Sequence, residues 1–255
     1  MKRILLFILL FTLFSCQKKS QKSKNNTQEK TTVQDKSVIV NLERSDPIIF
    51  NPETTQKLSE KEVNSIFTKR IKKRLGIEYP IYQAYTYKDS LGLQYLLLTD
   101  HYLQGKEKND RTYYAIKAFQ LYSKDNTFKK RSTFKDEIDK DWEVAISFWN
   151  EYSELADFDN DGYMDLILTY GTLGPDGYAD GRVKIMIYHN RTRATIRHQN
   201  SEYGGRLTKI SSKFYMLPKS IQKVAIEKMK LLSQNHATFT KGWEKKMKEK
   251  ATRIE

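Results

Sequence analysis

Residues 94–122 read QYLLLTDHYLQGKEKNDRTYYAIKAFQLY and contain two runs rich in tyrosine, leucine and β-branched residues on either side of a polar link. Runs of this composition, bounded by Gly, Asn and Asp, are typical of antiparallel β-strands. The same character continues along the chain from Tyr79 to His198. The sequence therefore predicts a domain built mainly from β-strands.

The strands that this pattern predicts number about eight. Their ranges are 79–87, 94–102, 112–122, 128–134, 142–152, 163–170, 183–189 and 194–198. The links 88–92, 123–126 and 190–193 are short enough for hairpins, so we expect an antiparallel meander rather than alternating strands and helices.

Two helices are expected to flank these strands. Ser59 and Glu62 have the spacing of a capping box, and apolar residues recur at helical spacing from there to Gly76. A second amphipathic helix is predicted at about 220–232, after Pro218. The fold class predicted is α+β, mainly β, with an N-terminal and a C-terminal helix.

The N-terminus has the pattern of a bacterial lipoprotein signal. Residues 1–15 combine Lys2 and Arg3 with a short apolar run, and LFSC at 13–16 looks like the lipobox at which a signal peptidase cuts before a cysteine. We expect 1–15 to be removed and Cys16 to carry lipid, including palmitate. We then expect a flexible basic tether within 16–37, a single globular domain over 38–240 and a basic tail at 241–255.

The composition of the chain favours anionic partners. The chain has 45 Lys and Arg against 31 Asp and Glu, a net charge of +14 that falls by two when the signal is removed. Such an excess favours lipid phosphate, lipopolysaccharide and acidic surface polysaccharide. We expect anchoring in the outer membrane through Cys16, facing the periplasm or the cell surface, and no nucleic-acid partner. Because Cys16 is the only cysteine, the domain has none for a disulfide or redox pair.

The stretch DFDNDGYMD at 157–165 has acidic residues at positions one, three, five and nine, and glycine at six. This is the oxygen-rich spacing of a calcium loop, with Asp157, Asp159, Asp161 and Asp165 as carboxylate ligands and Tyr163 as a carbonyl ligand. Position twelve is Leu168 and the flanks read as strands, so the segment is not an EF-hand. The alternative is a tight hairpin turn without metal, held by Asp and Asn side chains.

Other chemistry is weakly indicated. The carboxylate pairs Glu143 with Glu151 and Asp176 with Asp180 suit acid–base work on a sugar, yet their sequence context resembles ordinary surface carboxylates. The aromatic residues at 142, 148, 149 and 152 either stack on sugar rings at an exposed face or fill the core. We predict no catalytic residue, and the sequence does not identify a ligand-binding residue.

Several segments together resemble a family of Gram-negative lipoproteins labelled surface polysaccharide biosynthesis proteins. They are YLLLT at 95–99, the strand 115–122, WEVAISF at 142–148, DFDNDG at 157–162 and VKIMIY at 183–188 with 194–197. The acidic loop also looks like the calcium loops of FG-GAP repeats, although this chain has only one copy. The family resemblance implies envelope polysaccharide biology and supplies no catalytic residues.

We therefore predict a membrane-anchored, non-enzymatic accessory or binding protein in the biosynthesis or display of cell-surface polysaccharide. Two alternatives stay open. One is a glycan-acting enzyme that uses carboxylates near Asp157, and the other is an envelope binding or immunity lipoprotein.

Overall fold

The computed structural model describes residues 46–105, 111–125 and 127–255, which belong to one compact unit, Ser37–Glu255. The predicted signal peptide, Cys16 and tether lie outside these residues. Within them, no helix is long and apolar enough to cross a membrane.

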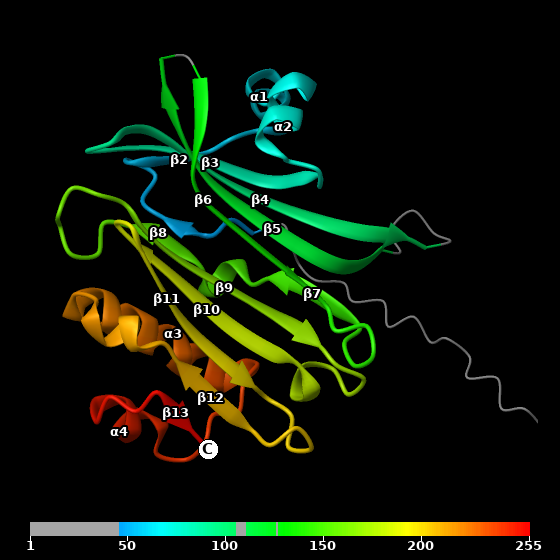
Figure 1. Ribbon diagram of the computed structural model, residues 1–255, viewed down its shortest axis with the longest axis vertical. Coiled ribbons are helices and arrows are strands. Elements are labelled where there is room, and N and C mark those ends of the chain that lie inside the picture. Colours follow the sequence, from blue (N-terminus) through cyan, green and yellow to red (C-terminus); the bar gives the residue numbers. More distant parts are fainter. Residues whose placement is uncertain (1–45, 106–110, 126) are drawn as a thin grey trace, which may run out of the picture. The chain divides into compact units, whose positions relative to one another are not determined.

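The described strands form two sheets, A and B, which pack face to face with helices on both outer faces (Figure 1). Sheet A contains β1 (Ile49–Phe50), β7 (Ala145–Phe148), β8 (Glu154–Ala156), β9 (Asp165–Leu173), β10 (Arg182–His189), β11 (Thr192–Gln199), β12 (Leu207–Ile210) and β13 (Arg253–Ile254). Sheet B contains β2 (Thr55–Lys57), β3 (Ile81–Asp89), β4 (Gly92–Gln104), β5 (Arg111–Lys124) and β6 (Thr127–Glu137).

The α-helices are α1 (Glu60–Ile66), α2 (Lys69–Leu75), α3 (Lys219–Asn235) and α4 (Trp243–Lys248). Short 3-10 turns occur at η1 (Asn150–Tyr152), η2 (Tyr178–Asp180) and η3 (Ser212–Met216). The layers therefore run α1 and α2, sheet B, sheet A, then α3 and α4 (Figure 1).

The strand order confirms the mainly β, α+β class and refines it. Sheet A has the order β1-β8-β9-β10-β11-β12-β13, with β7 also paired to β9, and sheet B runs β2-β3-β4-β5-β6. Every pair is antiparallel except β1 with β8. The three predicted hairpins form at β3–β4, β5–β6 and β10–β11. The meander thus exists in two parts, one in each sheet.

Burial on both faces explains why strand sequences such as YLLLT are continuously apolar. Leu96 and Leu98 of β4 face the core between the sheets, which they share with Leu166 and Leu168 of β9. The alternate residue Leu97 points to the opposite face and joins the core beneath α1 and α2. Sheet A has a third core, where residues of β10 and β11 meet the apolar side of α3.

Local sequence signals set the helix ends. Ser59 and Glu62 form the capping box, and Gly76 ends α2 with a left-handed φ of 62°. The predicted single helix is divided, because Phe67 leaves helical geometry and Thr68 caps a new start with its hydroxyl. The predicted second helix is confirmed as α3 and extends three residues further at its C-terminus, to Asn235.

The prediction of a basic tail at 241–255 is wrong. This segment contains α4 and β13, and Trp243, Met247 and Ile254 are buried in the core beneath sheet A. Its lysines dominate the composition, but the apolar residues between them lie on one side and face α3 and the sheet.

Candidate functional site

The acidic loop links β8 to β9 and brings its carboxylates together as predicted. Oxygens of Asp157, Asp159 and Asp165 lie within 4.8 Å of one another. Asp161 belongs to a second group with Asp159 and a ring nitrogen of His189, within the same limit. The structure thus assembles all four predicted carboxylates and adds one histidine.

The same carboxylates also hold the loop's own backbone. Asp157 accepts hydrogen bonds from the backbone N–H groups of Asp161 and Gly162 at 3.1 and 2.9 Å. Asp161 accepts a hydrogen bond from the Tyr163 backbone N–H at 2.9 Å. The hairpin-turn alternative therefore has direct geometric support.

His189 was not among the predicted site residues because it is isolated in the sequence. It lies at the end of β10, where its Nδ1 is 2.8 Å from the buried Asp165 carboxylate. Burial raises the pKa of Asp165 to about 6, although the hydrogen bonds from His189 and from the Phe158 N–H oppose the rise. The Asp165 side chain has no exposed area.

Calcium binding by this loop remains a prediction, with one observation in its favour. Asp159 Oδ1 is buried and has no hydrogen-bond partner among the described residues, whereas the other converging carboxylates are engaged. A bound cation would satisfy an oxygen of this kind.

We expect 10 mM calcium to raise the melting temperature of the protein by several degrees. Loops of this type in extracellular modules bind at about 10⁻⁴–10⁻³ M, which corresponds to a stabilisation of about 1.4–2.7 kcal/mol. The rise should disappear with excess chelator and in Asp159→Ala, and should persist in the control Asp176→Ala, an exposed aspartate in another turn. If calcium leaves the wild-type melt unchanged, the loop is a hairpin turn only.

The loop also forms one wall of a groove between the two sheets. Gly162 accepts hydrogen bonds at its carbonyl from the Ser90 N–H and hydroxyl, at 3.0 and 2.9 Å. Gly162 has a φ of 84°, and a Cβ there would lie 2.8 Å from Ser90 Oγ, so glycine is required. These bonds tie the β8–β9 loop to the β3–β4 turn.

This groove has a volume of about 1180 Å³ and a basic lining. Its lining residues come from β5, β6, the β3–β4 turn, the acidic loop and the β10–β11 hairpin: Leu91, Gln120, Tyr122, Lys130, Arg131, Ser132, Thr133, Tyr163, Tyr188, Asn190, Arg191, Thr192 and Arg193. Four of them are basic, three are tyrosines and none is acidic. We call this site the basic groove.

Arg131 holds the two walls of the basic groove together. Its Nη2 donates a hydrogen bond to the Asn190 carbonyl at 3.0 Å, and its Nη1 lies 3.7 Å from the buried Asp89 carboxylate. Asn190 in turn donates to Asp161 at 3.1 Å. Arg131 is therefore a structural cation, whereas Lys130, Arg191 and Arg193 are exposed and available to a ligand.

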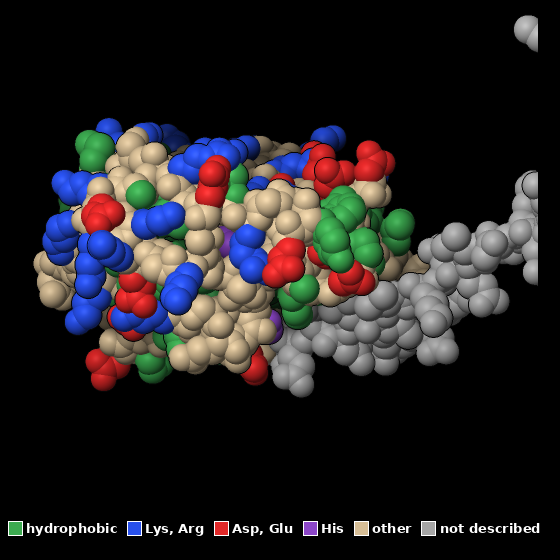
Figure 2. Space-filling model, turned by 90° about the horizontal axis from the view of Figure 1, so that it is seen from below, with side chains coloured by type: hydrophobic (Ala, Val, Ile, Leu, Met, Phe, Trp, Pro, Cys, Tyr) green, Lys and Arg blue, Asp and Glu red, His purple; other side chains and the backbone are tan. Residues whose placement is uncertain are grey.

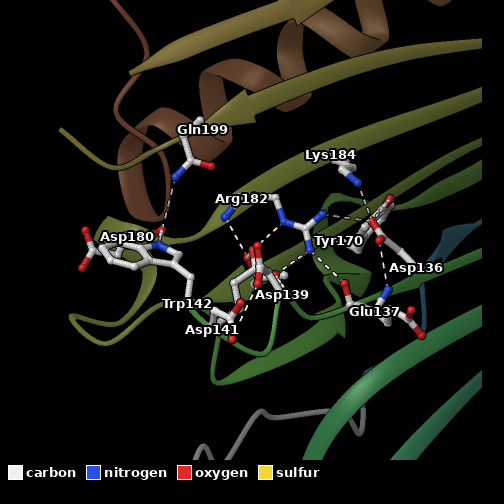
Figure 3. Close-up of polar contacts among 12 residues, drawn as sticks. Asp136, Glu137, Asp139, Asp141, Trp142, Tyr170, Asp180, Arg182, Lys184 and Gln199 are labelled. Atoms are coloured by element: carbon white, nitrogen blue, oxygen red, sulfur yellow. Dashed lines mark hydrogen bonds and ion pairs between the residues drawn. The ribbon is translucent and has the colours of Figure 1, made fainter. Parts of the chain in front are cut away.

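A second, smaller pocket of about 380 Å³ lies where β6 leads towards β7. Its lining residues are Glu137, Ile138, Asp139, Trp142, Glu143, Arg182 and Gln199. We call it the Trp142 pocket. Figure 3 shows how the polar groups of β6, β9 and β10 converge at its floor.

An ion-pair network forms that floor and connects the sheets. Glu143, whose side chain is 2% exposed, binds the Arg182 guanidinium through both of its oxygens. Arg182 also lies 3.5 Å from Asp136 of sheet B, and Asp136 accepts from Lys184 and from the Tyr170 hydroxyl (Figure 3). Burial alone would raise the pKa of Asp136, but the hydrogen bonds from Lys184 and Tyr170 and the charges of Lys184 and Arg182 lower it. Asp136 is thus held ionised as the partner of Lys184 and Arg182.

The carboxylate pairs suggested for acid–base work do not form. Glu143 is ion-paired with Arg182, and Glu151 is exposed beside His236. Asp180 is buried and Asp176 is exposed. Among the aromatic candidates, Phe148, Trp149 and Tyr152 fill the cores, while Trp142 is 43% exposed.

Positive charge at the end of the domain that carries α3 and α4 is more dispersed (Figure 2). On the face seen in Figure 2, at the end of the domain that carries α3 and α4, Lys and Arg side chains are interspersed with Asp and Glu. Lys230, for example, pairs with Glu227 at 3.0 Å. The basic groove differs because no carboxylate is among its lining residues.

Comparisons of the chain with protein-family models, with curated proteins and with solved structures gave no match.

Proposed function

We propose that this protein is a lipid-anchored envelope protein that binds a segment of an anionic surface polysaccharide in the basic groove, without catalysing a reaction on it. This places it among accessory proteins of polysaccharide biosynthesis or display. Anchoring through an acylated Cys16 in the outer membrane, with palmitate among its acyl chains, is part of the same proposal.

The observation that carries the proposal is the lining of the basic groove. Lys130, Arg191 and Arg193 are exposed on two facing walls, and Arg131 adds a fourth cation between them. Cations that face one another across a concave surface focus the electric field and attract polyanions. Arg131 is paired with Asp89, whereas no carboxylate among the lining residues pairs with Lys130, Arg191 or Arg193.

The remaining lining groups suit a sugar chain. Tyr122 and Tyr163 provide partly exposed rings with polar ends, and Thr192 provides a hydroxyl group for sugar hydroxyls. The volume of about 1180 Å³ exceeds the usual range of roughly 300–1,000 Å³ for small-molecule sites. A segment of several sugars fits this size better than one ring does.

Immobilised polygalacturonate is a direct probe, with neutral dextran as the comparison. We expect the protein to bind polygalacturonate in 25 mM salt, to bind more weakly in 200 mM salt because exposed charges are screened, and not to bind dextran. The triple variant Lys130→Ala, Arg191→Ala, Arg193→Ala should bind about 100-fold more weakly at low salt, from about 1 kcal/mol per cation near an anionic surface.

The matched control removes the same charge elsewhere. Lys213, Lys223 and Lys248 are exposed and lie outside the groove, so their triple alanine variant should bind within about twofold of wild type. Equal losses in both triple variants would show that net charge, and not the groove, binds the polymer. Binding that is insensitive to salt would also contradict the proposal.

A further inference from the structure

We propose that the Trp142 pocket is a separate binding site for a single neutral sugar ring, which stacks on the Trp142 indole. This site goes beyond the proposed function, because the charged residues of its lining are mainly acidic whereas those of the basic groove are basic. The argument rests on the exposure of the indole, the fixed orientation of its ring and the polar groups around it.

Trp142 is the exposed member of the three tryptophans in the sequence. It is 43% exposed, compared with 6% for Trp149 and 8% for Trp243. Exposure of so large a ring leaves apolar surface in contact with water, which a stacked ligand would cover. The residue precedes β7 and belongs to neither core on the two sides of sheet A.

The indole is held in place before any ligand arrives. Its Nε1 donates a hydrogen bond to the Asp180 carbonyl at 3.2 Å, in the β9–β10 link (Figure 3). The next residue, Gly181, has no room for a Cβ, which would collide with the Thr172 carbonyl. The link therefore runs close to β9 and presents the Asp180 carbonyl at a defined position. A fixed ring costs little entropy when a ligand stacks on it.

The polar groups of the pocket are suited to sugar hydroxyls. Asp139 and Glu137 carry exposed carboxylates, and Gln199 contributes an amide on the opposite side. Carboxylate oxygens accept hydrogen bonds from hydroxyl groups, and an amide can both donate and accept. Beneath them, Glu143 receives the Thr172 hydroxyl at 2.6 Å as well as the Arg182 guanidinium, so the floor is rigid.

Size and charge select the ligand class. A volume of about 380 Å³ lies at the lower end of the range for small-molecule sites, which favours one ring. Acidic sugars are disfavoured, because three of the lining residues are acidic and Arg182, the single base, is already paired. An ammonium ligand would normally require several aromatic walls, and this pocket has one. A neutral hexose satisfies all of these conditions.

Saturation-transfer NMR on the purified protein tests the site with D-glucose, D-galactose and N-acetyl-D-glucosamine. We expect at least one of them to receive saturation and to bind with a millimolar Kd. Trp142→Ala should raise that Kd by at least about 10-fold, whereas Trp142→Phe, which keeps an aromatic face, should raise it by only a few fold. Circular dichroism of both variants confirms that they are folded.

The triple alanine variant of the basic groove distinguishes this inference from the proposed function. It should lose polygalacturonate and keep the hexose signal, while Trp142→Ala should show the reverse. The inference is overturned if none of the three sugars at 100 mM receives saturation, if Trp142→Ala binds as well as wild type, or if choline chloride binds and the sugars do not.

Discussion

Glu143→Ala is expected to lower the free energy of unfolding by about 3 kcal/mol, measured by urea denaturation. Glu143 receives two bonds from Arg182, one from the Thr172 hydroxyl and one from the Asp139 N–H. Removing one partner of a buried ion pair typically costs about 3–5 kcal/mol, because the other charge is left without compensation. The Arg182 side chain is 26% exposed and keeps Asp136 at 3.5 Å, so the lower end of that range applies.

The structure offers a matched control in the same segment. Glu137 belongs to the same pocket but pairs with Lys135 at the surface, where the two side chains are 63% and 48% exposed. Glu137→Ala should leave the urea midpoint unchanged within error, since exposed pairs contribute little. If both alanine variants lose the same free energy of unfolding, the contribution of Glu143 to stability does not depend on its burial.

Acidification should destabilise the protein through His198, by an amount on the order of 3 kcal/mol between pH 7 and pH 4. The pKa of His198 is lowered from 6.5 to about 4, chiefly by burial and also by the nearby Arg206 charge, although the hydrogen bond to Asn200 opposes the shift. The His198 imidazole is therefore protonated below about pH 6.5 in the unfolded chain, but only below about pH 4 in the folded chain. The stability that the neutral imidazole contributes is complete above pH 6.5 and lost as the pH falls towards 4.

The test compares the pH dependence of unfolding in wild type and His198→Gln. The imidazole lies 2.9 Å from Thr208 Oγ1 and 3.2 Å from Asn200 Oδ1, and it packs against Phe239. Glutamine will cost stability at pH 7, but it has no proton to gain, so its stability should fall less steeply from pH 6.5 to pH 4. Parallel curves for the two proteins would exclude His198 as the source of the acid sensitivity.

Much of the fold could be predicted because its signals are local. The strands, the hairpins, the capping box at Ser59 and the stop at Gly76 each depend on a few neighbouring residues. The division into two sheets could not be predicted in this way. Leu96 and Leu97 are equally apolar, and only the packed structure shows that one faces sheet A and the other faces α1 and α2.

Prediction of the candidate sites was also limited to features that are contiguous in the sequence. The acidic loop is contiguous, so its carboxylates were found from spacing alone. His189 is 24 residues beyond Asp165, and only the pairing of β9 with β10 brings the two side chains together. The basic groove combines residues from both sheets, and none of its cations is distinguishable in the sequence from the many other lysines and arginines.

Strand β6 has one further consequence, because it is the last strand of sheet B among the described residues. An edge strand exposes unpaired backbone groups that can recruit the same strand of another molecule and begin aggregation. Here β6 carries Lys129, Lys130, Arg131 and Lys135 along its length. Two such edges would bring like charges together, so the residues that make one end of β6 basic also keep neighbouring copies from joining edge to edge.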